Sequence, residues 1–253
     1  YPAAIEDAYT ALQWVAKNIE DLGGDSARLV VAGESAGGNL AAVVALKARN
    51  EGGPRIAGQI LYYPATDLTD TQYLSRDKFS DGYGLSTEAA HSFHEAYVGH
   101  IEDKSDPYVS PVYAPSLANM PPTLMVTAGF DRLLDSCRAF AKRLQQAGTP
   151  VTYANYPGMI HGFMNIGVFP AKREALVETA AFLHDLPPTT SALATGVPQD
   201  LPRSDKPFAN RPGNFQFVIV GDRTGGHRPG VFRHAIERIN QLQPEFVVGV
   251  GDL

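Results

Sequence analysis

One serine of the chain stands in a pattern that could make it a nucleophile. Ser35 lies between Gly33 and Gly37 in a Gly-x-Ser-x-Gly motif, after an apolar run at 29–32 and before a helix-like run at 39–48. A serine on such a strand-to-helix turn presents its hydroxyl above the edge of the sheet. Glycine is expected at both flanking positions because a side chain there would collide in the tight strand–helix packing.

A serine hydroxyl attacks a carbonyl efficiently only when a histidine takes its proton and a carboxylate orients that histidine. On this type of turn the chain order is serine, acid, histidine. Asp131 follows a strand-like run at 123–128, and His161 follows another at 151–156. Both residues therefore lie just past the C-terminal end of a strand, where open parallel sheets collect their functional groups.

These residues belong to motifs that resemble those of the hormone-sensitive-lipase-like esterases, which have the α/β-hydrolase fold. The motifs are Gly33-Glu34-Ser35-Ala36-Gly37-Gly38, Gly129-Phe130-Asp131-Arg132-Leu133-Leu134-Asp135 and Gly158-Met159-Ile160-His161-Gly162-Phe163. The resemblance covers residues 1–185. It implies a hydrolase of small-molecule carboxylic esters that works through an acyl-enzyme and needs no cofactor. Ser35 would be its nucleophile, Asp131 its orienting acid and His161 its base.

Two neighbours of these residues also bear on the chemistry. The backbone N–H of Ala36 lies at a helix N-terminus and is expected to help bind the oxyanion. Asp135 is a competing carboxylate, but it comes one helical turn after Asp131 and is expected to point along the crossover helix at 133–147.

The chain departs from the esterase family in two respects. Glu34 stands where the family often has aspartate, and we expect this to change the contacts around the site rather than the chemistry. The family's upstream His-Gly-Gly-Gly loop, which supplies further oxyanion donors, does not occur in the sequence. Residues 1–15 resemble the helix that follows that loop. We therefore expect the early part of the hydrolase to be missing from this sequence, and the fragment to be weakly active or inactive.

Composition narrows the class of protein. Hydrophobic residues make up 44% of the chain and charged residues 19%, which is ordinary for a globular protein. The net charge of −6 gives no reason to expect a nucleic-acid or anionic-membrane partner. No run is long and apolar enough for a membrane span. A single cysteine, Cys137, excludes an intrachain disulfide and is expected to be an apolar filler.

Other side chains are weaker candidates for a functional role. His91 and His94 lie three residues apart on a helix expected over 86–98, a spacing that could bind a metal. Because no third ligand is evident, we interpret them as a solvated or pocket-lining pair. The turn-rich segment 65–85 is expected to be a loop that borders the acyl pocket. Aromatic residues that could either line this pocket or pack in the core are Tyr62, Tyr63, Phe79 and Tyr83.

The composition changes after a helix expected over 171–184. Residues 186–210 are rich in proline, serine and threonine without periodicity, which predicts a linker. Residues 211–253 have the pattern strand, helix, strand, which predicts a separate small βαβ unit. Both strands are followed by Gly-Asp, at Asp222 and Asp252.

Two carboxylates at the ends of neighbouring parallel strands could share a divalent metal pair. The segment resembles the opening of the calcineurin-like metallophosphoesterases, which implies Asp222, His227 and Asp252 as metal ligands. The family's later motifs would lie beyond Leu253, so we expect an incomplete site that would hold the metal pair only in a complete phosphoesterase domain. A generic βαβ turn produces the same pattern and stays an alternative.

The sequence therefore predicts an α/β protein: the C-terminal part of an α/β-hydrolase parallel sheet at 1–185, a linker, and a small βαβ unit. Three alternatives to a serine esterase stay open. They are a serine peptidase of the prolyl-oligopeptidase type, a non-catalytic ligand-binding relative, and a bifunctional esterase and metallophosphoesterase. The three motifs together favour the esterase over the peptidase, and the presence of His161 disfavours a non-catalytic relative.

Overall fold

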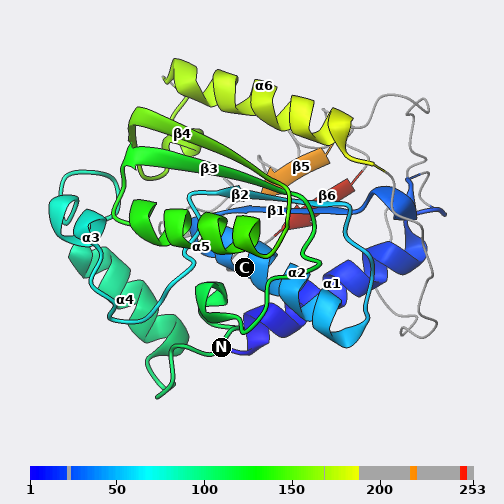
Figure 1. Ribbon diagram of the computed structural model, residues 1–253, viewed down its shortest axis with the longest axis horizontal. Helices are drawn as coiled ribbons and strands as arrows, with labels where there is room; N and C mark the ends of the chain where they lie inside the picture. The colour runs from blue at the N-terminus through cyan, green and yellow to red at the C-terminus, as the bar shows by residue number, and fades with distance from the viewer. Residues whose placement is uncertain (22–23, 168, 188–216, 221–245, 250–253) are drawn as a thin grey trace, which may run out of the picture.

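A parallel β-sheet forms the centre of the computed structural model, which describes residues 1–21, 24–167, 169–187, 217–220 and 246–249. Its strands pair in the order β1-β2-β3-β4 (Figure 1). They are β1 (Val30–Glu34), β2 (Gly58–Tyr62), β3 (Thr123–Phe130) and β4 (Val151–Ile160). All three pairings are parallel, so the carboxyl ends of the four strands meet at one edge.

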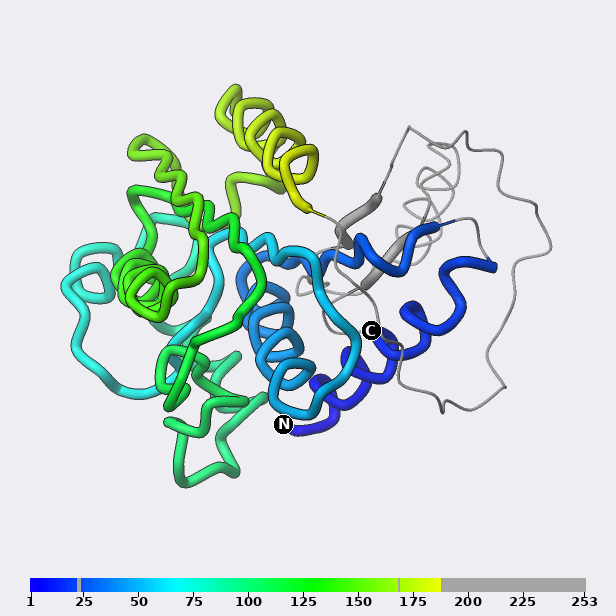
Figure 2. The backbone as a smooth tube through the Cα atoms, turned by 45° about the vertical axis from the view of Figure 1, so that its right-hand side comes forward, coloured from blue at the N-terminus to red at the C-terminus, as the bar shows by residue number. Residues whose placement is uncertain are grey.

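Helices cover both faces of this sheet and give three layers. They are α1 (Ala3–Asn18), α2 (Ser35–Glu51), α3 (Leu74–Lys78), α4 (Thr87–Val98), α5 (Leu134–Gln146) and α6 (Pro170–Asp185). α1, α2 and α5 lie on one face and α6 on the other (Figures 1 and 2). α3 and α4 lie beyond the edge at which the strands end (Figure 1). Short 3-10 turns occur at η1 (Ser26–Arg28), η2 (Pro111–Tyr113) and η3 (Phe163–Asn165).

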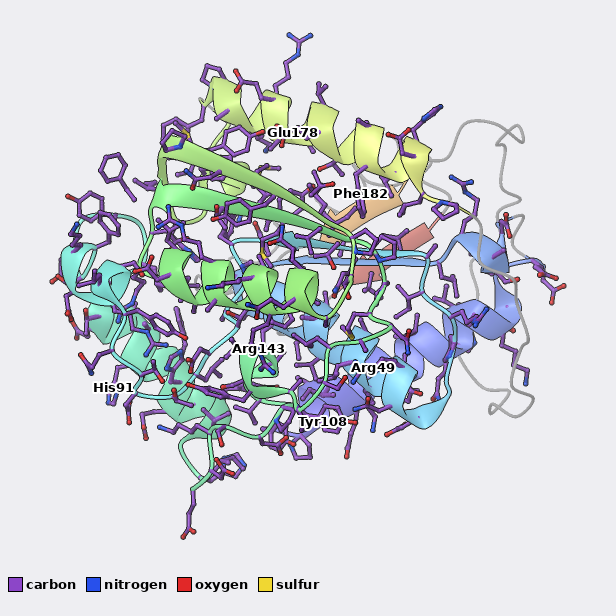
Figure 3. The ribbon with its side chains drawn as sticks, in the orientation of Figure 1. Arg49, His91, Tyr108, Arg143, Glu178 and Phe182 are labelled. Carbon is purple, nitrogen blue, oxygen red and sulfur yellow. The ribbon has the colours of Figure 1, made fainter. Side chains whose placement is uncertain are left out.

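The two middle strands, β2 and β3, are largely buried because helices cover the sheet on both sides. Every residue of β2 is buried, as a parallel sheet covered on both faces requires. Alternate residues point to opposite faces. Leu61 packs in the core with α1, α2 and α5, whereas Ile60 and Tyr62 pack in the core beneath α6. Phe182 of α6 lies between its helix and the sheet (Figure 3).

Two arginines hold the segment around η2 in place. Arg143 of α5 donates to the carbonyl oxygens of Val112 and Ala114. Arg49 of α2 donates to those of Ser116 and Ala118 (Figure 3). Guanidinium groups thus satisfy carbonyls that would otherwise lack partners in an irregular segment. The segment packs in the core formed with α1, α2 and α5.

The short helix α3 lies inside the segment 65–85, which we expected to be entirely loop. Contacts far along the chain hold it, because Ser75 Oγ donates to the carbonyl of Arg132 and the Ser75 N–H donates to Asp135. Five residues are too few for a helix that is stable without tertiary contacts. No local pattern could therefore predict it. The strand expected at 151–156 also continues to Ile160, since Phe130 pairs with Ile160 after a shift in register.

The C-terminal part is described only at two strands, which form a separate parallel pair. β5 (Phe217–Val220) pairs with β6 (Phe246–Gly249). These strands were both expected, but Asp222, His227 and Asp252 lie outside the described residues, as does most of the expected linker. Leu186, which we assigned to that linker, is buried and packs close to Gly58 of β2. None of the helices in the described ranges combines the length and apolarity that crossing a bilayer requires.

Candidate active site

The turn at Ser35 joins β1 directly to α2. β1 ends at Glu34 and α2 begins at Ser35, with no residue between them. Ser35 has a φ of 51°, in the left-handed region that residues other than glycine rarely adopt. Such a conformation costs about 1–3 kcal/mol and persists only where the surrounding structure enforces it. The tight junction of strand and helix supplies that constraint.

Glycines make this junction possible. A Cβ added to Gly33 would lie 2.1 Å from the carbonyl oxygen of Gly37, which is backbone and cannot swing away. Glycine was expected at both of these positions. The requirement for glycine at Gly38 was not predicted: an added Cβ there would lie 2.8 Å from the Cβ of Pro64. Strand β1, helix α2 and the segment after β2 therefore approach one another closely near the serine.

Gly33→Ala is expected to lower the free energy of unfolding by about 1–3 kcal/mol or more, because the added methyl group meets backbone rather than a movable side chain. Urea unfolding followed by circular dichroism measures the change. Gly158→Ala is the matched control, since an added Cβ there has no neighbour within 4 Å. Equal stability of the two variants would show that the packing under Ser35 is looser than the structure indicates.

His161 lies between the serine and an aspartate. Its Nε2 is 3.0 Å from Ser35 Oγ, and its Nδ1 is 2.8 Å from Asp131 Oδ2. The His161 side chain is 11% exposed and that of Asp131 only 1%. An imidazole protonated at Nδ1 satisfies both contacts, because it donates to the carboxylate and leaves Nε2 to accept the serine proton. The structure thus brings Ser35, His161 and Asp131 into one hydrogen-bonded line.

Both oxygens of the Asp131 carboxylate have partners. Oδ2 faces His161, and Oδ1 accepts the N–H of Leu133 at 2.9 Å. A buried carboxylate needs such partners, and they also fix its orientation. Asp135, the competing carboxylate, instead accepts the N–H of Ser75 and pairs with Arg138. It points toward α3 and forms no described contact with the imidazole.

The segment before α4 holds His161 from the other side. The His161 N–H donates to the carbonyl oxygen of Tyr83 at 3.2 Å. Gly84 has a φ of +94°, and a Cβ there would come within 2.5 Å of the His161 carbonyl oxygen. Only glycine allows this close approach. The segment 65–85, which we expected to border the acyl pocket, therefore contacts His161 through Tyr83 and Gly84, and the requirement for glycine at 84 was not predicted.

An aromatic wall, formed by Phe79, Tyr83 and Phe130, lies beside this contact. Tyr83 and Phe130 are stacked with centroids 5.6 Å apart, and Phe79 meets both edge-on. Phe130 is 40% exposed although it is apolar. Phe79 and Tyr83 were among the aromatic residues that could line the pocket, whereas Phe130 was noted only as part of the acid motif. Tyr62, another of those aromatic residues, belongs to the core, where its hydroxyl pairs with Thr179 of α6.

Other predicted candidates lie elsewhere. His91 is exposed on α4 (Figure 3). Burial, together with the positive charges of Arg76, Lys104 and Arg132, lowers the pKa of His94 to about 4. In the described ranges no three histidine, cysteine, aspartate or glutamate side chains gather as metal ligands would.

Ala36 lies at the start of α2, whereas Cys137 lies in the core. Ala36 is the second residue of α2, and the first N–H groups of a helix have no intrahelical partner. An oxyanion above Ser35 would meet such a group, and this role stays a prediction. Cys137 is fully buried on α5, and its thiol contacts the carbonyl of Pro64 at 3.1 Å.

Comparisons with known proteins agree with this architecture. A family model described as alpha/beta hydrolase fold matches residues 1–165. Esterase LipI of Mycobacterium tuberculosis is 40% identical over 190 residues, which cover 73% of this chain and 59% of that protein. The ethyl acetate hydrolase of Pseudomonas putida is 37% identical over 170 residues, 66% of this chain and 52% of that protein.

Solved structures give the same result. A thermostable esterase from Pseudomonas putida ECU1011 superposes with a TM-score of 0.70 at 39% identity, covering 74% of this chain and 60% of that one. A carboxylesterase from a metagenomic library, EstE1, superposes with a TM-score of 0.71 at 38% identity, covering 74% and 65%. The chain thus spans less than two thirds of the length of these proteins.

Proposed function

The chain belongs to the alpha/beta hydrolase fold family, and on that premise we propose that it hydrolyses carboxylic esters with Ser35 as the nucleophile. The expected α/β-hydrolase sheet is confirmed by the family match and by the solved esterases. The observation that carries the proposal is the hydrogen-bonded line Ser35–His161–Asp131 at the carboxyl edge of that sheet. Relatives named esterase and carboxylesterase favour esters as substrates.

In the proposed reaction Ser35 Oγ attacks the ester carbonyl while His161 Nε2 takes the hydroxyl proton. Asp131 holds the Nδ1–H and stabilises the imidazolium, and the N–H of Ala36 donates to the oxyanion. The intermediate collapses when His161 returns its proton to the leaving alkoxide, which departs as the alcohol. Water then attacks the acyl-enzyme with His161 again as base, and releases the acid and the free serine. No cofactor takes part in these steps.

A matched pair of substrates tests the class of reaction. A p-nitrophenyl ester and the p-nitroanilide of the same acyl group differ only in the bond that is cleaved. We expect this protein to hydrolyse the ester and to leave the anilide intact. Faster cleavage of the anilide would assign the site to a peptidase. A folded protein that cleaves neither substrate would favour a non-catalytic relative.

The aromatic wall supports a preference for esters that carry an apolar group. Phe130 directly precedes Asp131, and the Tyr83 carbonyl accepts the His161 N–H, so the exposed Phe130 ring and the partly buried Tyr83 ring belong to residues next to the proposed triad. Phe130→Ala is expected to lower the ratio of kcat/KM for hexanoate over acetate esters, or for benzyl over ethyl acetate, by about tenfold. Phe93→Ala on α4 is the control, because Phe93 is about as exposed as Phe130, at 46% against 40%, but is not part of the aromatic wall. Unchanged ratios in both series would exclude the wall from substrate binding.

The resemblance of residues 211–253 to metallophosphoesterases supports a second, separate proposal. The parallel register of β5 and β6 pairs Val220 with Gly249, so these strands end side by side. Asp222 and Asp252 follow two and three residues later in the sequence. We propose that these carboxylates, with His227, would bind a divalent metal pair only within a complete phosphoesterase domain.

A further inference from the structure

A second buried carboxylate lies beside the proposed triad. Glu34 immediately precedes Ser35, yet its side chain turns inward and the residue is only 7% exposed. Its Oε2 accepts the hydroxyl proton of Tyr63 at 2.7 Å, and its Oε1 accepts an amide proton of Asn165, also at 2.7 Å. Both oxygens are therefore used, and they join the serine turn to two other segments.

Those two segments both lead to His161. Tyr63 follows β2 directly, and its ring centroid is 5.0 Å from that of His161 at an angle of 60°. Asn165 lies in η3, four residues after His161 in the sequence. Glu34 thus connects the turn at Ser35 with Tyr63, whose ring packs on His161, and with η3, which follows His161 in the chain.

Tyr63 occupies its position under backbone constraint. Its φ is 35°, in the region that favours glycine, and the residue is 1% exposed. Its N–H donates to the carbonyl of Val126 at 2.6 Å, and its ring also contacts Phe163. Burial and the charge of Glu34 raise the pKa of the Tyr63 hydroxyl, which stays a donor. Tyr63 is thus buried on a strained backbone and is held at its hydroxyl and at its N–H, which suits its ring to fixing a neighbouring side chain.

We propose that Glu34 and Tyr63 act as a positioning pair that keeps the His161 imidazole in line with Ser35 Oγ. In this proposal the pair acts only through the packing of Tyr63 against the ring of His161. This inference rests on the proposed function, because it assumes that His161 is the base. It accounts for Glu34, where we expected altered contacts: a carboxylate one methylene shorter would not span from Tyr63 to Asn165 in the same way.

Tyr63→Phe removes the hydroxyl and keeps the ring, whereas Glu34→Gln keeps the length and removes one acceptor. Each variant is expected to lower kcat for a p-nitrophenyl ester about ten- to hundredfold, since small misplacements of a base are costly, with KM changed less than about twofold. The double variant is expected to be no worse than the stronger single one, because partners that act as a unit are not additive. The low-field proton NMR signal of the His161 Nδ1–H should broaden or shift in both variants.

Tyr62→Phe is the matched control. It removes a neighbouring buried hydroxyl of the same core, which pairs with Thr179 of α6 rather than with Glu34. It should lower stability without changing kcat or the NMR signal. Wild-type kcat in folded Tyr63→Phe would overturn the inference, as would a rise in KM alone or effects that multiply in the double variant. Ser35→Ala, measured alongside, separates the two claims: if it stays active, the proposed function itself fails.

Discussion

Ser35→Ala is expected to lower kcat for a short-chain p-nitrophenyl ester by about 10⁵-fold or more, the largest effect of any single substitution in the chain. The reason is that alanine leaves His161 with no hydroxyl to activate, so no acyl-enzyme can form. Stopped assays over long incubations, with the uncatalysed rate subtracted, measure the residual activity.

The control for this prediction is Ser92→Ala, which removes an exposed hydroxyl from α4. It should leave turnover unchanged. Circular dichroism of both variants establishes that they are folded. Near-normal turnover by folded Ser35→Ala would contradict the serine mechanism, whatever the activity of the other variants.

Asp131→Asn is expected to reduce kcat by about 10⁴-fold while leaving the fold intact. The amide can still accept the N–H of Leu133 through its oxygen. Its NH₂ group would then face His161 Nδ1 and donate to it, so that the imidazole carries its proton on Nε2. That tautomer cannot accept the proton of Ser35, and the nucleophile stays inactive.

Asp135→Asn provides a matched comparison, because it makes the same chemical change one helical turn away. Asp135 bonds to Ser75 and Arg138 rather than to the imidazole, so we expect kcat to stay within a few fold. A severe effect of Asp135→Asn together with a mild effect of Asp131→Asn would assign the orienting acid to Asp135.

Much of the arrangement around Ser35 could be predicted from the sequence. The apolar runs before Ser35, Asp131 and His161 indicate strands, and parallel strands place their carboxyl ends at a single edge. Three residues that are far apart in the chain are thereby expected to meet. The helix over 86–98 also follows from local signals, since serine is a favoured N-cap residue. The Ser86 side chain caps α4 by accepting the N–H of Ala89.

The features that the sequence did not predict depend on contacts between distant segments. α3 depends on Ser75 contacting Arg132 and Asp135. The strained backbone of Tyr63 and its bond to Glu34 have no local signature, because a tyrosine after a buried strand is usual in a core. Leu186 reads as linker by composition, yet it is buried against Gly58.

Covalent labelling of the native protein tests the central claim most directly. A fluorophosphonate reacts with a serine that a neighbouring base activates, and digestion followed by mass spectrometry locates the adduct. We predict one adduct, on Ser35, and its loss in folded His161→Ala, which lacks the base. An adduct on another serine, equal labelling of Ser35 in His161→Ala, or an unlabelled Ser35 in protein that still hydrolyses esters would contradict the assignment of Ser35 as a nucleophile activated by His161.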